Sequence, residues 1–258
     1  MRTLWVLMLK EWQEAWRDRK LIWLPVVITL LAVSQPITQY YMPEILDMAG
    51  NLPEGAVIEI PVPSGEEVLA GTLSQLGLMG TAIFVLSIMG SIAHERNNGA
   101  LTLVMARPVQ PLHYIASKWA ANAVILLLSF GIAYGLSYYY TNLLFNEVEA
   151  KRFFGSLAVY SIWILFTLAV TLLGGVFFRK VGGIAGASLV AVSVLSLCGS
   201  LFPKFMGWSP SNSLSQASHF LMTGKWEDSF GLMLGSSFVL LACLFVFTVL
   251  KFSRYESY

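Results

Sequence analysis

The chain has 258 residues, of which 56% are hydrophobic and only 12% are charged, whereas soluble globular domains carry roughly 25% charged residues. This composition excludes an ordinary soluble fold. The formal net charge of +1 is too balanced for a nucleic-acid-binding domain, so we expect no nucleic-acid partner. An aromatic content of 13% excludes disorder, and Cys198 and Cys243 lie in apolar runs that indicate neither a disulfide framework nor a metal site.

Residues 1–20 have the pattern of an amphipathic helix. Apolar side chains recur at helical spacing, and charged side chains occupy much of the remaining surface. The apolar side chains are Trp5, Met8, Leu9, Trp12 and Trp16, and the charged ones are Lys10, Glu11, Glu14, Arg17 and Asp18. Because indole rings favour the membrane interface, we expect a helix lying in the cytoplasmic interface. The alternative is a flexible basic flank.

Six charge-free intervals are long enough to cross a bilayer, which takes about 20 apolar residues in a helix. They predict an all-α polytopic membrane protein, a single transmembrane domain over residues 1–258, with spans at about 21–43, 69–93, 119–142, 155–178, 181–203 and 229–250. A seventh interval, residues 205–224, contains Pro210, Gln216 and five serines, which are costly in hydrocarbon. We therefore expect residues 204–228 to form an outside loop.

Lysine and arginine are unevenly distributed between the segments that connect these spans. Six spans place both termini on one side, and that side holds 12 basic residues against 4 on the other. Acidic residues show the opposite bias, with 5 on the first side and 10 on the second. Because cytoplasmic segments carry the excess of Lys and Arg, we predict a multi-pass protein of the cell membrane with both termini in the cytoplasm.

The first predicted outside loop, residues 44–67, contains six acidic residues and no basic residue. Such a segment would attract a cationic substrate. The alternative is a solvated loop whose acidity follows from the topology alone.

The predicted cytoplasmic loop, residues 94–118, mixes charged and apolar residues in a pattern that a simple connector does not need. Asn97-Asn98-Gly99 indicates a turn, residues 100–106 suit a short helix, and Pro108 and Pro111 end it. A short helix with an apolar face, held under the membrane, is the form expected of a docking element for a cytoplasmic partner. The alternative is an inert loop.

The sequence contains no Gly-x-x-x-x-Gly-Lys-Ser/Thr phosphate loop with which the chain would hydrolyse ATP on its own. The six predicted spans also lack the Asp, Glu, Lys and Arg residues that gradient-driven carriers place inside the membrane. A membrane hydrolase is the rival enzyme class, but His94, His113 and His219 accompany no catalytic or metal-binding pattern. We expect no catalytic residue, no metal and no bound cofactor in this chain, and an energy source in another subunit.

Together these features resemble the permease subunits of type 2 ABC transporters, the ABC-2 family, and within it the NosY-like short bacterial permeases. The motif that carries the resemblance is Glu95-Arg96-Asn97-Asn98-Gly99-Ala100-Leu101, followed by Ala106-Arg107-Pro108-Val109. In that family a Glu-Arg-x-x-Gly-Thr-like turn and an Arg-Pro element lie between the second and third helices, and here Ala100 replaces the commoner threonine. The motif covers only the 94–118 loop, whereas the topology covers the whole chain.

The resemblance implies a permease pair, either two copies of this chain or this chain with a homologous permease, in the lipid bilayer. It also implies two copies of a cytoplasmic ABC ATPase subunit that bind ATP and Mg²⁺. The 94–118 loop would then be the coupling loop, with a short coupling helix and the contact residues Glu95, Arg96, Asn98, Gly99, Leu101, Arg107 and Pro108. Glu95 and Arg96 would make charged contacts in a groove of the ATPase. Leu101 would pack into that groove or against the interfacial helix.

Polar residues inside the predicted spans mark candidates for a translocation path, because lipid-facing positions should be apolar. The candidates are Gln35 and Gln39 on the first span, Gln75 on the second and Asn122 on the third. Hydrogen bonding between packed helices is the alternative role. On the fifth span, Gly182 and Gly186 have a Gly-x-x-x-Gly spacing that permits close packing, either within the subunit or between two subunits.

The predicted function is that of a permease subunit, an exporter of an unidentified substrate, which works by alternating access driven by ATP hydrolysis in a separate subunit. The alternative is a non-transporting membrane sensor or immunity scaffold whose cytoplasmic loop binds a regulator. Transport of a labelled substrate into proteoliposomes that contain the ATPase distinguishes the two.

Overall fold

The structure is a computed structural model that describes residues 2–48, 62–105 and 109–255. Every regular element within these ranges is a helix, which confirms the predicted all-α fold. In chain order the elements are α1 (Arg2–Arg17), α2 (Lys20–Tyr40), α3 (Met42–Met48), α4 (Gly65–Gln75), the π-helical turn η1 (Leu76–Gly80), α5 (Thr81–Ile88), α6 (Gly90–Asn97), α7 (Ala100–Met105), α8 (Pro111–Leu144), α9 (Ala150–Phe177), α10 (Val181–Leu201), α11 (Pro203–Met206), the 3₁₀ turn η2 (Pro210–Asn212), α12 (Ser213–Thr223) and α13 (Phe230–Tyr255).

Six helical segments of the described chain are long and apolar enough to cross a membrane, as predicted. They are Lys20–Tyr40, Gly65–Asn97, Pro111–Leu144, Ala150–Phe177, Val181–Leu201 and Phe230–Arg254. The third segment begins well before the predicted start at residue 119. Lys118, which the sequence analysis placed in a loop, therefore lies within the helix α8.

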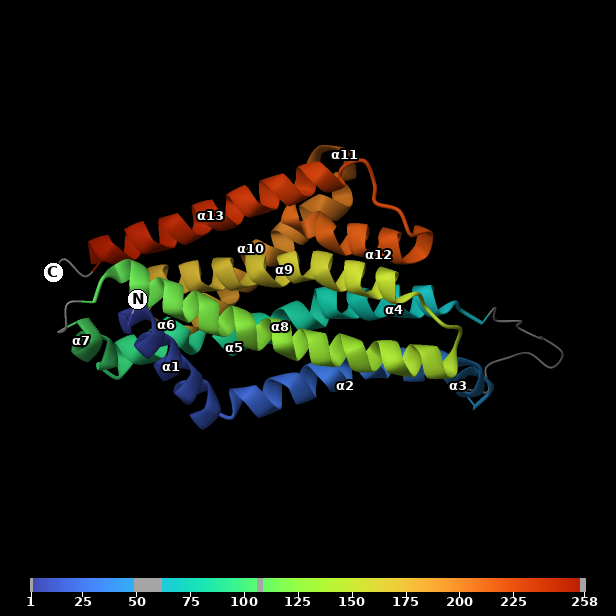
Figure 1. Ribbon diagram of the computed structural model, residues 1–258, viewed down its shortest axis with the longest axis horizontal. Helices are drawn as coiled ribbons and strands as arrows, with labels where there is room; N and C mark the ends of the chain where they lie inside the picture. The colour runs from blue at the N-terminus through green and yellow to red at the C-terminus, as the bar shows by residue number, and fades with distance from the viewer. Residues whose placement is uncertain (1, 49–61, 106–108, 256–258) are drawn as a thin grey trace.

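The bundle has two ends that differ in what they carry. Figure 1 shows both chain termini, α1, α6 and α7 toward one end, which we call the terminal end, and α3 and the start of α4 at the opposite end. The common position of the two termini agrees with an even number of spans. Of the acidic segment 44–67, residues 49–61 lie outside the described residues.

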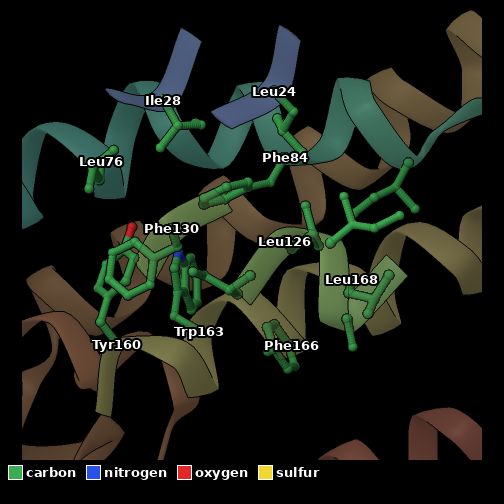
Figure 2. Close-up of a cluster of buried hydrophobic side chains, with 14 of the residues drawn as sticks. Leu24, Ile28, Leu76, Phe84, Leu126, Phe130, Tyr160, Trp163, Phe166 and Leu168 are labelled. Atoms are coloured by element: carbon green, nitrogen blue, oxygen red, sulfur yellow. The ribbon is translucent and has the colours of Figure 1, made fainter. Parts of the chain in front are cut away.

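The helices α8 and α9 form the centre of the bundle. α2 packs along α8, while α5, α10, α12 and α13 pack around α9. Figure 2 shows the core where Ile28 of α2 and Phe84 of α5 meet Phe130 of α8 and Tyr160 of α9. The rings of Phe130 and Tyr160 have centroids 5.0 Å apart, a contact that adds about 0.5–1.5 kcal/mol to the burial of their apolar surface.

The second span is interrupted by the π-helical turn η1. The hydroxyl of Thr81 donates to the carbonyl of Gly77 at 2.7 Å and accepts from the indole N–H of Trp163 at 3.0 Å. A π-turn leaves the backbone hydrogen bonding of a helix irregular, and these side chains fix it against α9. The span begins at Gly65 because the Ser64 side chain accepts from the Glu67 N–H in a capping box.

The segment 204–228, predicted to be an outside loop, is not one of the six candidate spans, but it is not irregular, because it contains α11, η2 and α12. α12 packs against α9 and α4, with Ser213, Ala217 and Leu221 buried. The polar residue that argued against burial, Gln216, donates to Glu227 at 2.7 Å and to Ser229 at 2.8 Å. The length of the charge-free interval did not identify α12, because the hydrogen-bond partners of its buried Gln216 lie in the segment that follows the helix.

Candidate functional site

The turn between α6 and α7 has a fully described backbone. α6 ends at Asn97, and the N–H of Asn98 donates to the carbonyl of His94 at 3.0 Å. Gly99 has a φ of +74°, a left-handed conformation that favours glycine over any residue with a Cβ. The side chain of Asn98 accepts from the N–H of Ala100 at 3.0 Å, which caps the start of α7. The predicted turn and short helix are therefore present.

The predicted contact residues of this loop differ in what they touch. Leu101 is buried in the hydrophobic core of the bundle, so it packs within the subunit. The Nη1 atom of Arg96 lies 3.5 Å from the carbonyl oxygen of Phe178 at the end of α9. Arg107 and Pro108 lie outside the described residues.

A buried group of charged side chains joins α1, α6 and α8 at the terminal end. At its centre is Lys118, whose side chain is 0% exposed. Its ammonium group donates to Glu11 at 2.8 Å, to Glu95 at 2.8 Å and to the carbonyl of Ser91 at 2.7 Å. An ammonium group has three donors, so all three are used. We call Glu11, Glu95, Tyr114 and Lys118, together with the partly exposed Lys10, the buried ionic cluster.

The position of Glu95 corrects the expectation that this residue makes a charged contact with a partner. Its side chain is only 2% exposed. One carboxylate oxygen accepts from Lys118 and from Lys10, and the other accepts from the hydroxyl of Tyr114 at 2.8 Å. Both oxygens are therefore occupied within the chain, and Glu95 lies behind the turn rather than on its surface.

The helix α1 presents an unexpected face to the bundle. Leu7, Glu11 and Ala15, spaced four residues apart, are buried, so Glu11 does not belong to a solvated polar face as predicted. The apolar stripe points away from the bundle and contains the exposed side chains of Trp5, Leu9, Trp12 and Trp16. Burial raises the pKa of Glu11, Lys118 opposes this shift, and the negative charge of Glu95 adds to it.

The sequence contains a signal for this cluster on α8. Tyr114, Lys118 and Asn122 are spaced four residues apart, so they lie on one face of α8. All three are buried, and Asn122 continues the polar contacts by accepting from Lys20 at 2.7 Å and donating to the carbonyl of Lys118 at 2.8 Å. A polar stripe at helical spacing that begins before an apolar span indicates a buried polar seam.

Three carboxylates of this region are close enough to share a metal ion. Oxygen atoms of Glu11, Glu14 and Glu95 lie within 4.8 Å of one another. The ammonium groups of Lys10 and Lys118, however, contact these same carboxylates. The arrangement is that of an ion-pair cluster, since cations already fill the positions that a metal would take.

An open groove lies beside the cluster, between α1 and the α6–α7 turn. Its volume is about 550 Å³. Its lining includes Lys10, Gln13, Glu14 and Arg17 from α1 and Asn98 and Ala100 from the turn. The groove is thus lined by charged and amide side chains of the terminal end.

The four candidates for a translocation path are not brought together. Asn122 belongs to the polar contacts at the terminal end, as described above. Gln75 donates to the hydroxyl of Ser34 at 3.2 Å, and the amide of Gln35 lies against Gly71, so both take part in the packing of α2 on α4. Gln39 lines a separate pocket of about 210 Å³ with Tyr40 and Phe145. The alternative of hydrogen bonding between packed helices describes Gln75, whereas Gln35 makes a packing contact.

Gly182 and Gly186 lie on an outward face of α10. A Cβ added to either would meet no atom within 4 Å in the described chain, so neither is needed for packing within the subunit. The exposed side chains of Val190, Val194 and Leu197 continue the same face. This face is left open for lipid or for another chain.

Comparison with known proteins decides the family. A family model described as "ABC-2 family transporter protein" matches residues 5–213. The chain belongs to the ABC-2 family. It is also 44% identical over 258 residues to the uncharacterized transmembrane protein YxlG of Bacillus subtilis (strain 168), and the match covers 100% of both chains. This ABC-2 family protein is thus a membrane transporter subunit, as the motif in the 94–118 loop predicted.

Proposed function

We propose that this ABC-2 family protein is the permease subunit of an ATP-driven exporter and that a separate cytoplasmic ABC ATPase supplies the energy. The observation that carries the proposal is the α6–α7 turn beside the groove on α1. A glycine in the left-handed region, a capped short helix and a groove with charged side chains together form a rigid surface for a partner. The sequence itself contains no phosphate loop.

The proposed orientation places the terminal end in the cytoplasm. The excess of 12 basic residues over 4 supports this side, and the groove is then accessible to a soluble ATPase. The exposed stripe of α1, with three tryptophans, would lie in the inner membrane interface. Two ATPase copies, each with ATP and Mg²⁺, would serve a permease pair that alternates between inward-open and outward-open states. Export is the direction favoured by the resemblance to NosY-like short permeases.

The groove is tested with the ABC ATPase encoded nearest to this chain's gene. Gly99→Val forces a β-branched residue into the left-handed region, and Arg17→Glu reverses an exposed charge in the groove. Both variants should insert normally but lose stimulation of ATP hydrolysis in proteoliposomes. The matched control is Lys204→Glu, which reverses an exposed charge on α11. Wild-type stimulation in both groove variants would refute the proposed docking surface.

The proposed permease pair uses the open face of α10. Gly186→Ile would add bulk where nothing of the same described chain lies within 4 Å, so the subunit fold should be retained while pairing is weakened. Gly235→Ile on α13 is the control, because its added Cβ also has open space. Cross-linking in native membranes measures the pair. Equal cross-linking in both variants would exclude α10 from the interface.

If the protein is a membrane sensor, a different outcome is expected in the proteoliposomes that contain the ATPase. ATP turnover that depends on the permease, with no movement of fluorescent peptide, dye or lipid probes, would favour the sensor over the exporter.

A further inference from the structure

The buried ionic cluster connects more of the molecule than the turn itself. Glu95 lies three residues before Asn98, on the last helical turn of α6. Through Lys118 it is joined to α8, and through Lys10 and Glu11 to α1. A displacement of the turn relative to α1 or α8 would therefore have to break buried ion pairs and hydrogen bonds, which is costly.

The cluster also reaches the last span. The hydroxyl of Tyr114 donates a hydrogen bond to Glu95, and the ring of Tyr114 stacks on Phe252 of α13 with centroids 4.9 Å apart and planes 12° apart. Phe252 is 0% exposed. One side chain thus contacts the carboxylate behind the turn through its polar end and the sixth span through its ring.

The first span is held in the same way. Lys20 is the first residue of α2, and its ammonium group donates to Asn122, whose own amide donates to the carbonyl of Lys118. Polar contacts therefore run without interruption from α2 through α8 to the turn, and α1 and α13 are attached on either side. Lys10 and Glu95 of the cluster line the groove, whereas Lys118 and Tyr114 do not line it and are buried. Gln13 of α1 and Asn97 of α6 are exposed.

We propose that Lys118 and Tyr114 are positioning residues for energy coupling: they hold the α6–α7 turn, α1 and the ends of α2 and α13 as one unit that a partner bound in the groove moves as a whole. This inference rests on the proposed function. In this proposal Lys118 and Tyr114 do not contact the ATPase. They act by holding the α6–α7 turn against α1, α8 and α13.

The first measurement uses the permease alone. Spin labels replace Gln13 of α1 and Asn97 of α6 in a variant whose Cys198 and Cys243 are changed to Ala, and paramagnetic resonance gives the distance distribution in nanodiscs. We expect one narrow distribution in the wild-type cluster and a broad one in Tyr114→Phe and in the charge-balanced pair Lys118→Met with Glu11→Gln. Narrow distributions in every variant would overturn the positioning role.

The second measurement adds the ABC ATPase. The variants should bind it with unchanged affinity, because the exposed groove residues are intact, but stimulated hydrolysis at saturating permease should fall at least five-fold with the KM for ATP unchanged. The matched control is Tyr134→Phe, which removes a buried hydroxyl from the same helix, bonded to Ser156 at 2.9 Å. Full stimulation in Tyr114→Phe would overturn the inference.

The two measurements separate the inference from the function on which it rests. A wild-type permease that neither binds nor stimulates the ATPase would overturn the proposed function and, with it, the coupling role. The distance distributions, recorded without the ATPase, would still decide whether Lys118 and Tyr114 position the turn. Loss of the fold in the Lys118 pair would leave Tyr114→Phe, which removes only one oxygen, as the deciding variant.

Discussion

Replacing Lys118 with methionine should destabilise the protein more than any other single change of a charged side chain that the structure suggests. Methionine keeps the length of the side chain but removes the ammonium group, which is 0% exposed and holds two carboxylates at 2.8 Å. Glu11 and Glu95 would remain buried, close together, with Lys10 as the nearby cation. Breaking a buried pair by removing one partner costs about 3–5 kcal/mol, and we expect a loss in this range.

The size of the loss can be assigned to charge by a second change. Glu11→Gln in the Lys118→Met background restores the charge balance of the cluster and leaves the Lys10–Glu95 pair. The double variant should lose only about 1–2 kcal/mol, the cost of the missing hydrogen bonds. The control is Lys251→Met, because the Lys251 ammonium is exposed and lies 5.3 Å from the ring centroid of Phe177, a contact with a value of about 0.5–1 kcal/mol.

Equilibrium unfolding in mixed micelles of mild detergent and SDS, followed by tryptophan fluorescence, measures these free energies. The double variant should be more stable than Lys118→Met alone, which is a non-additive result. Losses that simply add, or a loss below about 1 kcal/mol for Lys118→Met, would show that the carboxylates find other partners and that the cluster is not closed.

Two further predictions concern other parts of the bundle, and a third concerns Glu11 of the buried ionic cluster. Gly155→Ala places a Cβ against the buried ring of Phe220 and should lower the free energy of unfolding by about 1–3 kcal/mol. Gly135→Ala, where the added Cβ has open space, should not lower it. Equal free energies of unfolding for the two variants would refute the close packing of α12 on α9. Arg152→Met removes the donor to two carbonyls at the end of α12, so the free energy of local opening of residues 213–223 should fall by about 1–2 kcal/mol and their amide hydrogen exchange should become faster. Unchanged exchange would show that these hydrogen bonds do not stabilise α12. Because the pKa of Glu11 is raised above its ordinary 4.5, the folded state binds this proton more tightly than the unfolded state does, so the free energy of unfolding should fall as pH rises from 4.5 through the raised pKa. Glu11→Gln should remove this contribution to the pH dependence of the free energy of unfolding. An unaltered pH dependence in Glu11→Gln would contradict the prediction.

The spans were predictable from the sequence because one physical requirement dominates them. A helix in hydrocarbon must be long and free of unpaired charge, and six intervals meet both conditions. The turn at Gly99 was predictable as well, since the Asn-Asn-Gly sequence favours a left-handed glycine that ends a helix.

Contacts between distant segments were not predictable in the same way. Glu11, Glu95 and Lys118 are far apart in the chain, and each alone resembles a solvated charge near a membrane end. Only the packing of α1 against α8 brings them together. The helix α12 was missed for a related reason, since its polar Gln216 is partnered by Glu227 and Ser229, which the local sequence does not connect to it.

The retention of such a cluster in a chain with so few charges needs a reason other than stability. A buried ionic group replaced by well-packed apolar residues of the same volume is often equally stable or more stable. Apolar side chains, however, pack acceptably in several registers, whereas Lys118 has three donors and three matched acceptors in one geometry only. The cluster lies directly behind the turn that the proposed ATPase would move. If α1 or α8 shifted relative to the turn there, the movement of the turn would not be transmitted to the spans. We therefore infer that the cluster fixes the position of the turn relative to α1 and α8. The difference in stimulated ATP hydrolysis between Tyr114→Phe and Tyr134→Phe distinguishes this positioning role from a contribution to stability alone.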